Sequence, residues 1–299
     1  MKRVDYIDIF ERAIKISWKY KFLWFFGFFV FFGSFSFNYN FNNNDSLWIG
    51  FYVKTVVFVC LVFLYVMRIL STISLIKSSN DLAVYRNSST LVILKESTES
   101  FWKIFFMEIL LGIFLLITLL VIAVPIATLF LMGANFLGFL AFILGMIIAI
   151  PLIVLVYFLK KYAYLYIVVA KNNLRKSIEA AYFLLNDNTR ESFVMAGTIV
   201  GIMVIVVIAT IFLFMFILII FGAICMFLFF VSKITALILG IIFSIILLVN
   251  FILIFSFAQS FLQIAWVLFF KKLSFIKSEE IFSNENIVVL ENITNPDTI

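Results

Sequence analysis

The chain has 299 residues, of which 65% are hydrophobic and 13% are charged. Soluble domains are closer to half apolar and a quarter charged, so this composition excludes a water-soluble globule and favours an integral membrane protein. The net charge of +6 does not indicate a nucleic-acid-binding protein, because the basic residues form no patch interleaved with aromatic residues and cluster at the ends of apolar runs instead.

The residue types present also limit the chemistry. The chain contains no histidine, which excludes imidazole bases, histidine metal sites and histidine-based triads. Its two cysteines, Cys60 and Cys225, lie inside apolar runs and are expected to be packing residues. No P-loop, HExxH, paired-cysteine or serine-nucleophile motif is present. We therefore expect no enzymatic activity, no catalytic residue, no cofactor and no bound metal.

The first predicted element is an amphipathic helix that begins at about residue 5. Ile7, Phe10, Ile14 and Trp18 recur at helical spacing, and charged residues occupy the opposite face. Such a helix is expected to lie along the inner membrane surface with its apolar face down. Trp18 and Trp24 are well placed for the interface. The candidate lipid-headgroup contacts in this region are Arg12, Lys15, Lys19 and Lys21.

Apolar runs predict about six membrane-spanning helices. The first two cover residues 22–37 and 47–76, and the third and fourth share the charge-free run 109–159, with a turn predicted at 132–135. The run 192–270 contains Lys233 as its only charge and, at 79 residues, is too long for two simple spans. We favour two spans with a break near Gly222; helices that overshoot the bilayer, a re-entrant segment at 221–231, or four short spans are alternatives.

Amphipathic connectors precede the third and fifth spans. Residues 91–103 and 174–188 each place apolar residues on one face and charges on another, which adds Lys95, Lys103, Arg175 and Lys176 to the candidate headgroup contacts. Three surface helices, each followed by a hairpin, suggest a threefold repeat over residues 5–88, 89–172 and 173–273. Ordinary amphipathic connectors explain the pattern equally well. Residues 1–273 thus form one membrane domain, and residues 274–299 a mostly disordered tail.

The distribution of Lys and Arg predicts the orientation. Nineteen of these residues lie in segments on one side of the six-span model, against Lys54 and Lys233 near the other side, with Arg68 inside a span. Basic loops stay in the cytoplasm, so both termini are expected there, in a bacterial-type inner membrane. No cleavable signal peptide is evident.

Polar groups inside the spans are candidates for function, because burying them in lipid is costly. Arg68 is expected to snorkel to the headgroups, and Glu108 to sit at the interface or to pair with Arg68 or a lysine. Asn250 is expected to form an interhelical hydrogen bond. Gln259 and Gln263 are four residues apart beside Trp266, and either line a polar cavity or link helices.

Four stretches carry a resemblance to a known family: ERAIKISWKYKFLWFFGFF, KESTESFWKIFFMEILLG, YLYIVVAKNNLRKSIEAAYFLL and AQSFLQIAWVLFFKKL. The chain resembles, over nearly all of residues 5–273, bacterial membrane proteins described as glycerophosphoryl diester phosphodiesterase membrane-domain-like. The resemblance implies a six-helix inner-membrane module. It does not imply the phosphodiesterase activity, since the catalytic domain of those enzymes uses histidines in a soluble barrel that this chain cannot supply.

Three functions remain open at the level of sequence. The first is a non-enzymatic membrane organiser or scaffold, whose partners are membrane lipids with anionic headgroups. The second is a transporter or channel for a small or lipid-like solute, with Arg68, Glu108, Gln259 and Gln263 along its path. A membrane-embedded lipid enzyme ranks last, because Glu108 has no second acidic or nucleophilic group nearby in the pattern.

Overall fold

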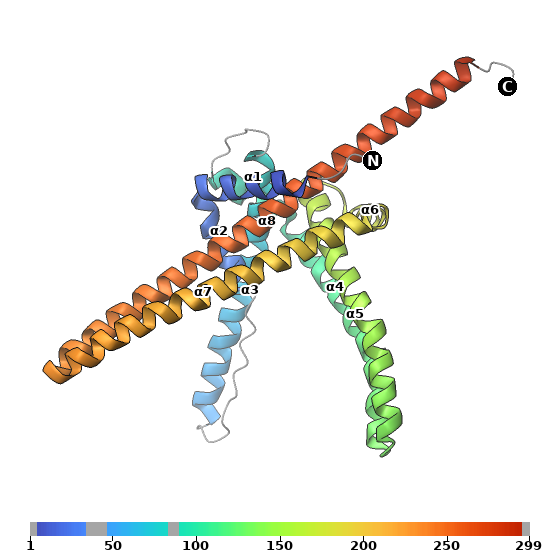
Figure 1. Ribbon diagram of the computed structural model, residues 1–299. Coiled ribbons are helices and arrows are strands. Elements are labelled where there is room, and N and C mark those ends of the chain that lie inside the picture. The colour runs from blue at the N-terminus through green and yellow to red at the C-terminus, as the bar shows by residue number, and fades with distance from the viewer. Residues whose placement is uncertain (1–4, 34–46, 83–89, 295–299) are drawn as a thin grey trace. The chain divides into compact units, whose positions relative to one another are not determined.

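The computed structural model describes residues 5–33, 47–82 and 90–294, which form eight α-helices and no strand (Figure 1). Five helices are long and apolar enough to cross a membrane: Val53–Leu82, Ile93–Leu131, Asn135–Val168, Thr189–Phe230 and Lys233–Ser274. The predicted all-helical class is therefore confirmed, and the five long apolar helices are compatible with a multi-pass membrane protein.

The first predicted span is shorter in the structure. Helix α2 (Phe22–Phe32) has 11 residues and rises about 16 Å, roughly half the thickness of a hydrocarbon core. The rest of the predicted span, beyond Gly33, lies outside the described residues. Where six spans were predicted, the described residues contain five long apolar helices and one short one.

Contacts divide the chain into two compact units, of which one comprises residues 3–86 and 193–269. It contains α1 (Tyr6–Lys19), α2, α3 (Leu47–Leu82) and most of α7 (Thr189–Val231) and of the membrane part of α8 (Lys233–Thr294). Helix α2 packs against α8 through small residues: Ser260 Oγ donates to the Leu23 carbonyl at 2.8 Å. A methyl group built at Gly27 would overlap the Ser256 carbonyl oxygen and Ser260 Oγ, so the two backbones approach closely here.

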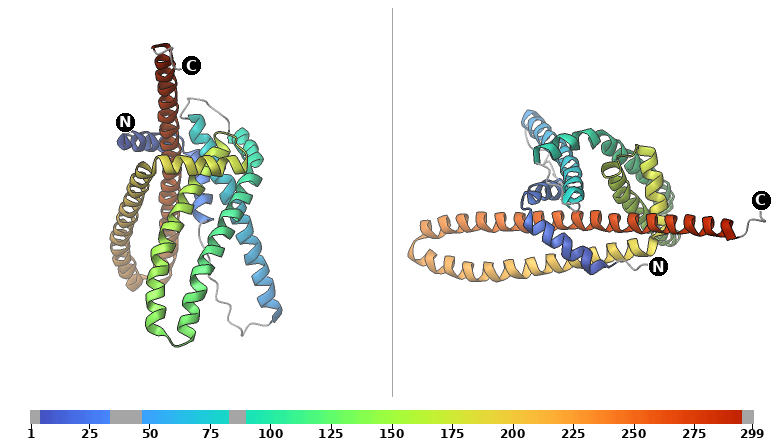
Figure 2. Two further views of the ribbon diagram at one scale, coloured as in Figure 1. Left: turned by 90° about the vertical axis from the view of Figure 1, so that its right-hand side faces the viewer. Right: turned by 90° about the horizontal axis from the view of Figure 1, so that it is seen from above.

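Helix α1 begins as the sequence predicts, because the Asp5 side chain accepts hydrogen bonds from the Ile7 and Asp8 backbone nitrogens. The sequence predicts one apolar and one charged face for α1, but in the structure its apolar residues divide between a buried face and an exposed face. Ile9, Ala13 and Ser17 are buried, while Ile7, Ile14 and Trp18 are exposed. The Phe10 ring, predicted to lie on the lipid face, contacts Phe261 of α8 at 6.0 Å, where Figure 2 shows α1 crossing α8.

The other unit comprises residues 87–192 and 270–299. Helices α4 (Thr90–Leu131) and α5 (Asn135–Val168) lie side by side as an antiparallel hairpin, and α6 (Leu174–Asp187) packs on α5 (Figures 1 and 2). The hairpin turn includes Gly133 with φ +77°, a conformation that favours glycine, so the turn predicted at 132–135 is confirmed. Lys171, with φ 54°, redirects the chain between α5 and α6.

Helix boundaries differ from the predictions at three places. The surface helix predicted at 91–103 is continuous with the following span in α4, since neither Gly nor Pro precedes Gly112 there. Helix α7 passes Gly222 without interruption and ends at Val231, so the predicted break at Gly222 is wrong. Helix α8 continues through Thr294, where the sequence predicts a disordered tail, because no Gly or Pro interrupts it before Pro296. The threefold repeat stays a prediction.

Candidate functional site

A buried charged cluster joins α4 to α5. The Lys160 ammonium lies 2.5 Å from Glu108 Oε1, and the Tyr164 hydroxyl donates a hydrogen bond to the same oxygen. The Lys160 nitrogen also lies 5.7 Å from the centre of the Tyr164 ring. We call these three residues the Glu108 cluster. It gives the carboxylate both a counter-charge and a hydrogen-bond donor, which a buried ionised group requires.

The hairpin register explains why these residues meet. Glu108 lies 25 residues before Gly133 and Lys160 lies 27 residues after it, so an antiparallel pair of helices brings them to the same level. Tyr164 follows Lys160 by one helical turn and shares its face. Of the two expectations for Glu108, an interfacial position or a pair with Arg68 or a lysine, the structure shows a pair with a lysine, and counting residues from the predicted turn identifies it as Lys160.

Exposure within the cluster is unequal. The Glu108 side chain is 5% exposed and that of Lys160 is 32% exposed. The ammonium can therefore reach polar surroundings, whereas the carboxylate is enclosed by protein, with Lys160 and Tyr164 among its partners. No group of three Cys, Asp or Glu residues suited to a metal ion occurs among the described residues. The cluster is thus suited to fixing α4 on α5 or to holding a charge at a set depth.

A second polar contact fixes the same end of α5. The Tyr162 hydroxyl and Ser192 Oγ lie 2.6 Å apart, and Ser192 Oγ donates to the Asn188 carbonyl at 2.7 Å. Tyr162 and Ser192 are both fully buried. This contact links α5 to the first turn of α7, and the sequence analysis did not anticipate it.

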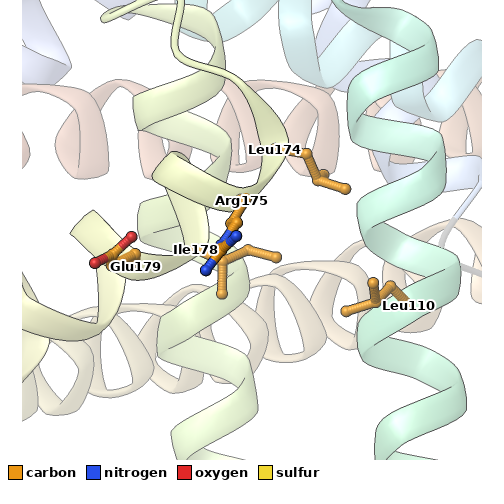
Figure 3. Close-up of a pocket in the computed structure, with 5 residues that line it drawn as sticks. All are labelled: Leu110, Leu174, Arg175, Ile178 and Glu179. Carbon is orange, nitrogen blue, oxygen red and sulfur yellow. The ribbon is translucent and has the colours of Figure 1, made fainter.

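A pocket of about 410 Å³ opens between α4 and α6 (Figure 3). Leu110 projects from α4, and α6 contributes the other four lining residues: Leu174, Arg175, Ile178 and Glu179. Figure 3 shows Leu110 and Ile178 pointing toward one another across the gap. The pocket combines an apolar wall with one positive and one negative side chain, so it can hold a ligand that has both an apolar and a charged part.

The remaining predicted intramembrane residues lie on α3 and α8. Arg68 is partly exposed, and its carbonyl accepts from Thr72 Oγ1 at 2.8 Å. Asn250 is exposed, and its amide donates to the Ile246 carbonyl of its own helix at 2.9 Å, where an interhelical bond was predicted. Gln263 is buried and Gln259 is partly exposed, with fully buried Trp266 nearby on α8. A polar path along these residues stays a prediction.

The predicted headgroup cations fall into two groups. Arg12 and Lys15 pair with Asp8 and Glu11 one turn earlier on α1, at 2.7 and 2.5 Å. These pairs reduce the net positive charge that α1 presents. The other six cations are at least partly exposed: Lys19, Lys21, Lys95, Lys103, Arg175 and Lys176.

Tryptophans mark one level on each unit. In the unit that holds α1, the Trp18 and Trp24 rings lie 5.8 Å apart and both contact Phe257, while Trp24 Nε1 donates to the Ser17 carbonyl at 2.9 Å.

On α4, Trp102 is 61% exposed. Its helical face carries Lys95 and Glu99 before it and exposed Phe106 and Leu110 after it. A change from charged to apolar residues at a tryptophan is typical of the membrane interface.

The chain matches no family model, no curated protein and no solved structure. The resemblance to the phosphodiesterase membrane-domain-like proteins therefore stays a prediction.

Proposed function

We propose that this protein is a non-enzymatic, multi-pass protein of a bacterial-type inner membrane. Its cytoplasmic face binds anionic lipid and so organises the membrane around it. Both termini lie on that face. The five long apolar helices support the membrane placement, and the basic connectors support the orientation.

The exposed side chains of α6 are the observation that carries the proposal. Arg175 and Lys176 are exposed on this helix together with Tyr182 and Phe183, each 52% exposed. Exposed aromatic rings are less stable in bulk water than at a membrane surface, and exposed cations are costly in hydrocarbon. A position in the headgroup layer accommodates both, since aromatic rings and basic side chains are each stable there.

Helix α1 supports the same placement in the other unit. Its exposed apolar residues, Ile7, Ile14 and Trp18, adjoin the face that carries Arg12, Lys15 and Lys19. Because two of those cations are paired within the helix, Lys19 is expected to contribute more to lipid binding than Arg12 or Lys15.

Native mass spectrometry of the full-length protein, released from nanodiscs containing phosphatidylglycerol and phosphatidylcholine, tests this function. We expect phosphatidylglycerol to be enriched among the retained lipids. The double substitution Lys19→Gln and Lys176→Gln should reduce the enrichment, by about fivefold for each lysine, since a basic residue near an anionic surface contributes about 1 kcal/mol.

Lys54→Gln combined with Lys233→Gln is the matched control. It removes the same charge from residues predicted to lie near the opposite side, and it should leave the enrichment unchanged. Retention of the two lipids in their bulk ratio by the unsubstituted protein would refute the proposed function.

A further inference from the structure

The pocket between α4 and α6 carries charges of both signs at a fixed spacing. Arg175 and Glu179 are one turn apart on α6, so their side chains lie on the same face of the helix, about 6 Å apart at their bases. Both are exposed rather than buried, which leaves the guanidinium and the carboxylate accessible to a ligand. A purely anionic headgroup would meet Glu179 unfavourably, whereas a headgroup with a phosphate and a cation can satisfy both residues.

The start of α6 favours a phosphate on the Arg175 side. The Asn173 side chain makes no capping hydrogen bond, and the first turn of the helix contains no acidic residue. Asn173 thus does not cap the backbone N–H groups of this turn, and they add to the attraction that the Arg175 guanidinium exerts on an anion. Glu179 lies beyond the first turn, where it can accept hydrogen bonds from an ammonium group.

The apolar wall supplies a place for hydrocarbon. Leu110, Leu174 and Ile178 line the pocket, and the volume of about 410 Å³ is within the usual range for a small-molecule site. Leu110 lies eight residues, or about 12 Å of helix, after Trp102 on the same face of α4. With Trp102 at the interface, Leu110 meets the upper part of an acyl chain, while Arg175 and Glu179 of the same pocket meet its headgroup.

From this arrangement, we propose that the pocket binds one phospholipid of the ethanolamine type. Arg175 holds the phosphate, Glu179 accepts hydrogen bonds from the primary ammonium, and one acyl chain runs along Leu110, Leu174 and Ile178. Phosphatidylcholine has the same charges, but its trimethylated nitrogen cannot donate a hydrogen bond to Glu179. Phosphatidylglycerol has no cation for Glu179. The site thus selects between lipids that the basic surface alone would not separate.

The inference rests on the proposed function only for its membrane placement, and lipid competition tests it separately. Full-length protein is released from nanodiscs that contain phosphatidylethanolamine, phosphatidylcholine and phosphatidylglycerol in equal amounts. As detergent is increased, native mass spectrometry records the last lipid to dissociate. We expect a single phosphatidylethanolamine, retained about tenfold over either competitor, as loss of one charge-assisted hydrogen bond implies.

Variants assign the selectivity to the pocket. Glu179→Gln should abolish the preference for phosphatidylethanolamine over phosphatidylglycerol, and Arg175→Gln should lower retention of all three lipids. Arg190→Gln is the matched control, since Arg190 is an exposed cation at the start of α7, outside the lining of the pocket, and it should keep the preference.

Unchanged melting temperatures would show that the variants fold. Equal retention of the three lipids by the unsubstituted protein would overturn the inference. So would a phosphatidylethanolamine preference that Glu179→Gln leaves intact. Enrichment of phosphatidylglycerol among the loosely held lipids would still support the proposed function in either case.

Discussion

Glu108 lies at a depth where a carboxylate is stable only with its partners. Its side chain is 5% exposed within a helix that is otherwise apolar from Ile109 onward. Lys160 and Tyr164 both bind the same carboxylate oxygen. Removing one member of a buried pair leaves the other charge uncompensated, which costs far more than the pair itself contributes to stability.

Lys160→Met should therefore destabilise the protein by about 3 kcal/mol, because it removes the cation that lies 2.5 Å from the buried Glu108 carboxylate. Glu108→Gln should cost only about 1 kcal/mol, because the amide still accepts from Tyr164 and the one-third-exposed Lys160 can turn toward water. Unfolding in mixed detergent micelles, followed by tryptophan fluorescence, measures both. The double variant Glu108→Gln/Lys160→Met should be more stable than Lys160→Met alone.

Lys15→Met provides the control for lysine removal. It breaks a pair of the same length with Glu11, but the two side chains are 71% and 60% exposed, so the cost should be at most about 1 kcal/mol. If Lys160→Met were no more destabilising than Lys15→Met, the Glu108 cluster would not be the buried ion pair that we describe.

At the level of elements, the contact of α2 with α8 depends on small residues. Gly27 and Ser260 let the two helix backbones approach, and Ser260 Oγ bridges to the Leu23 carbonyl. Gly27→Ala should separate the helices and destabilise the protein by about 1–3 kcal/mol, as overpacking does in other cores. The same unfolding measurement detects it.

Gly112→Ala is a closely matched control. It also replaces a glycine inside a helix, but nothing lies within 4 Å of the added methyl group. It should be neutral or stabilise α4 by up to about 1 kcal/mol, because alanine has the higher helix propensity. Equal effects of the two substitutions would mean that Gly27 is not at a close helix contact.

Local sequence predicted the elements better than it predicted their ends and contacts. Helical periodicity located α1 and α6, and the need for a left-handed residue located the turn at Gly133. Gly222 did not end α7, because a glycine is tolerated in a helix and nothing crowds it there. The interruption falls at Ser232, whose Oγ lies 3.4 Å from the Thr235 backbone nitrogen. A single serine within an apolar run is a weak signal for the end of a helix.

The candidate site was less accessible to sequence reasoning. The pairing of Glu108 with Lys160 follows from the hairpin register once the turn at Gly133 is known. The pocket does not follow, because it depends on how the chain at Lys171 places α6 against α4. Arg175 was predicted as one of many surface cations, and its combination with Glu179 and Leu110 needs the tertiary structure.

At the scale of the whole molecule, helix length and the positions of charged residues are the basis for the proposed membrane topology. Helix α7, with 43 residues, is about 64 Å long, more than twice a hydrocarbon core of about 30 Å. Lys233, next to the interruption at Ser232, is the only charged residue between Ser192 and Phe270. In the proposed topology each of the two long helices crosses once, by tilting or by extending beyond the hydrocarbon, and Ser232 is expected on the non-cytoplasmic side.

Single cysteines test this threading in intact cells. In a Cys60→Ala/Cys225→Ala background, Met132→Cys and Ser232→Cys should react with a membrane-impermeant maleimide added outside, because each lies between two long apolar helices that are proposed to cross the membrane. Lys171→Cys, in an exposed connector, should react only after the membrane is permeabilised, since the proposed orientation places the basic segment 160–190 in the cytoplasm. External labelling at position 171 would reverse the orientation and remove α6 from the cytoplasmic face. Protection at position 232, with labelling at position 132, would instead mean that α7 and α8 do not each cross the membrane once.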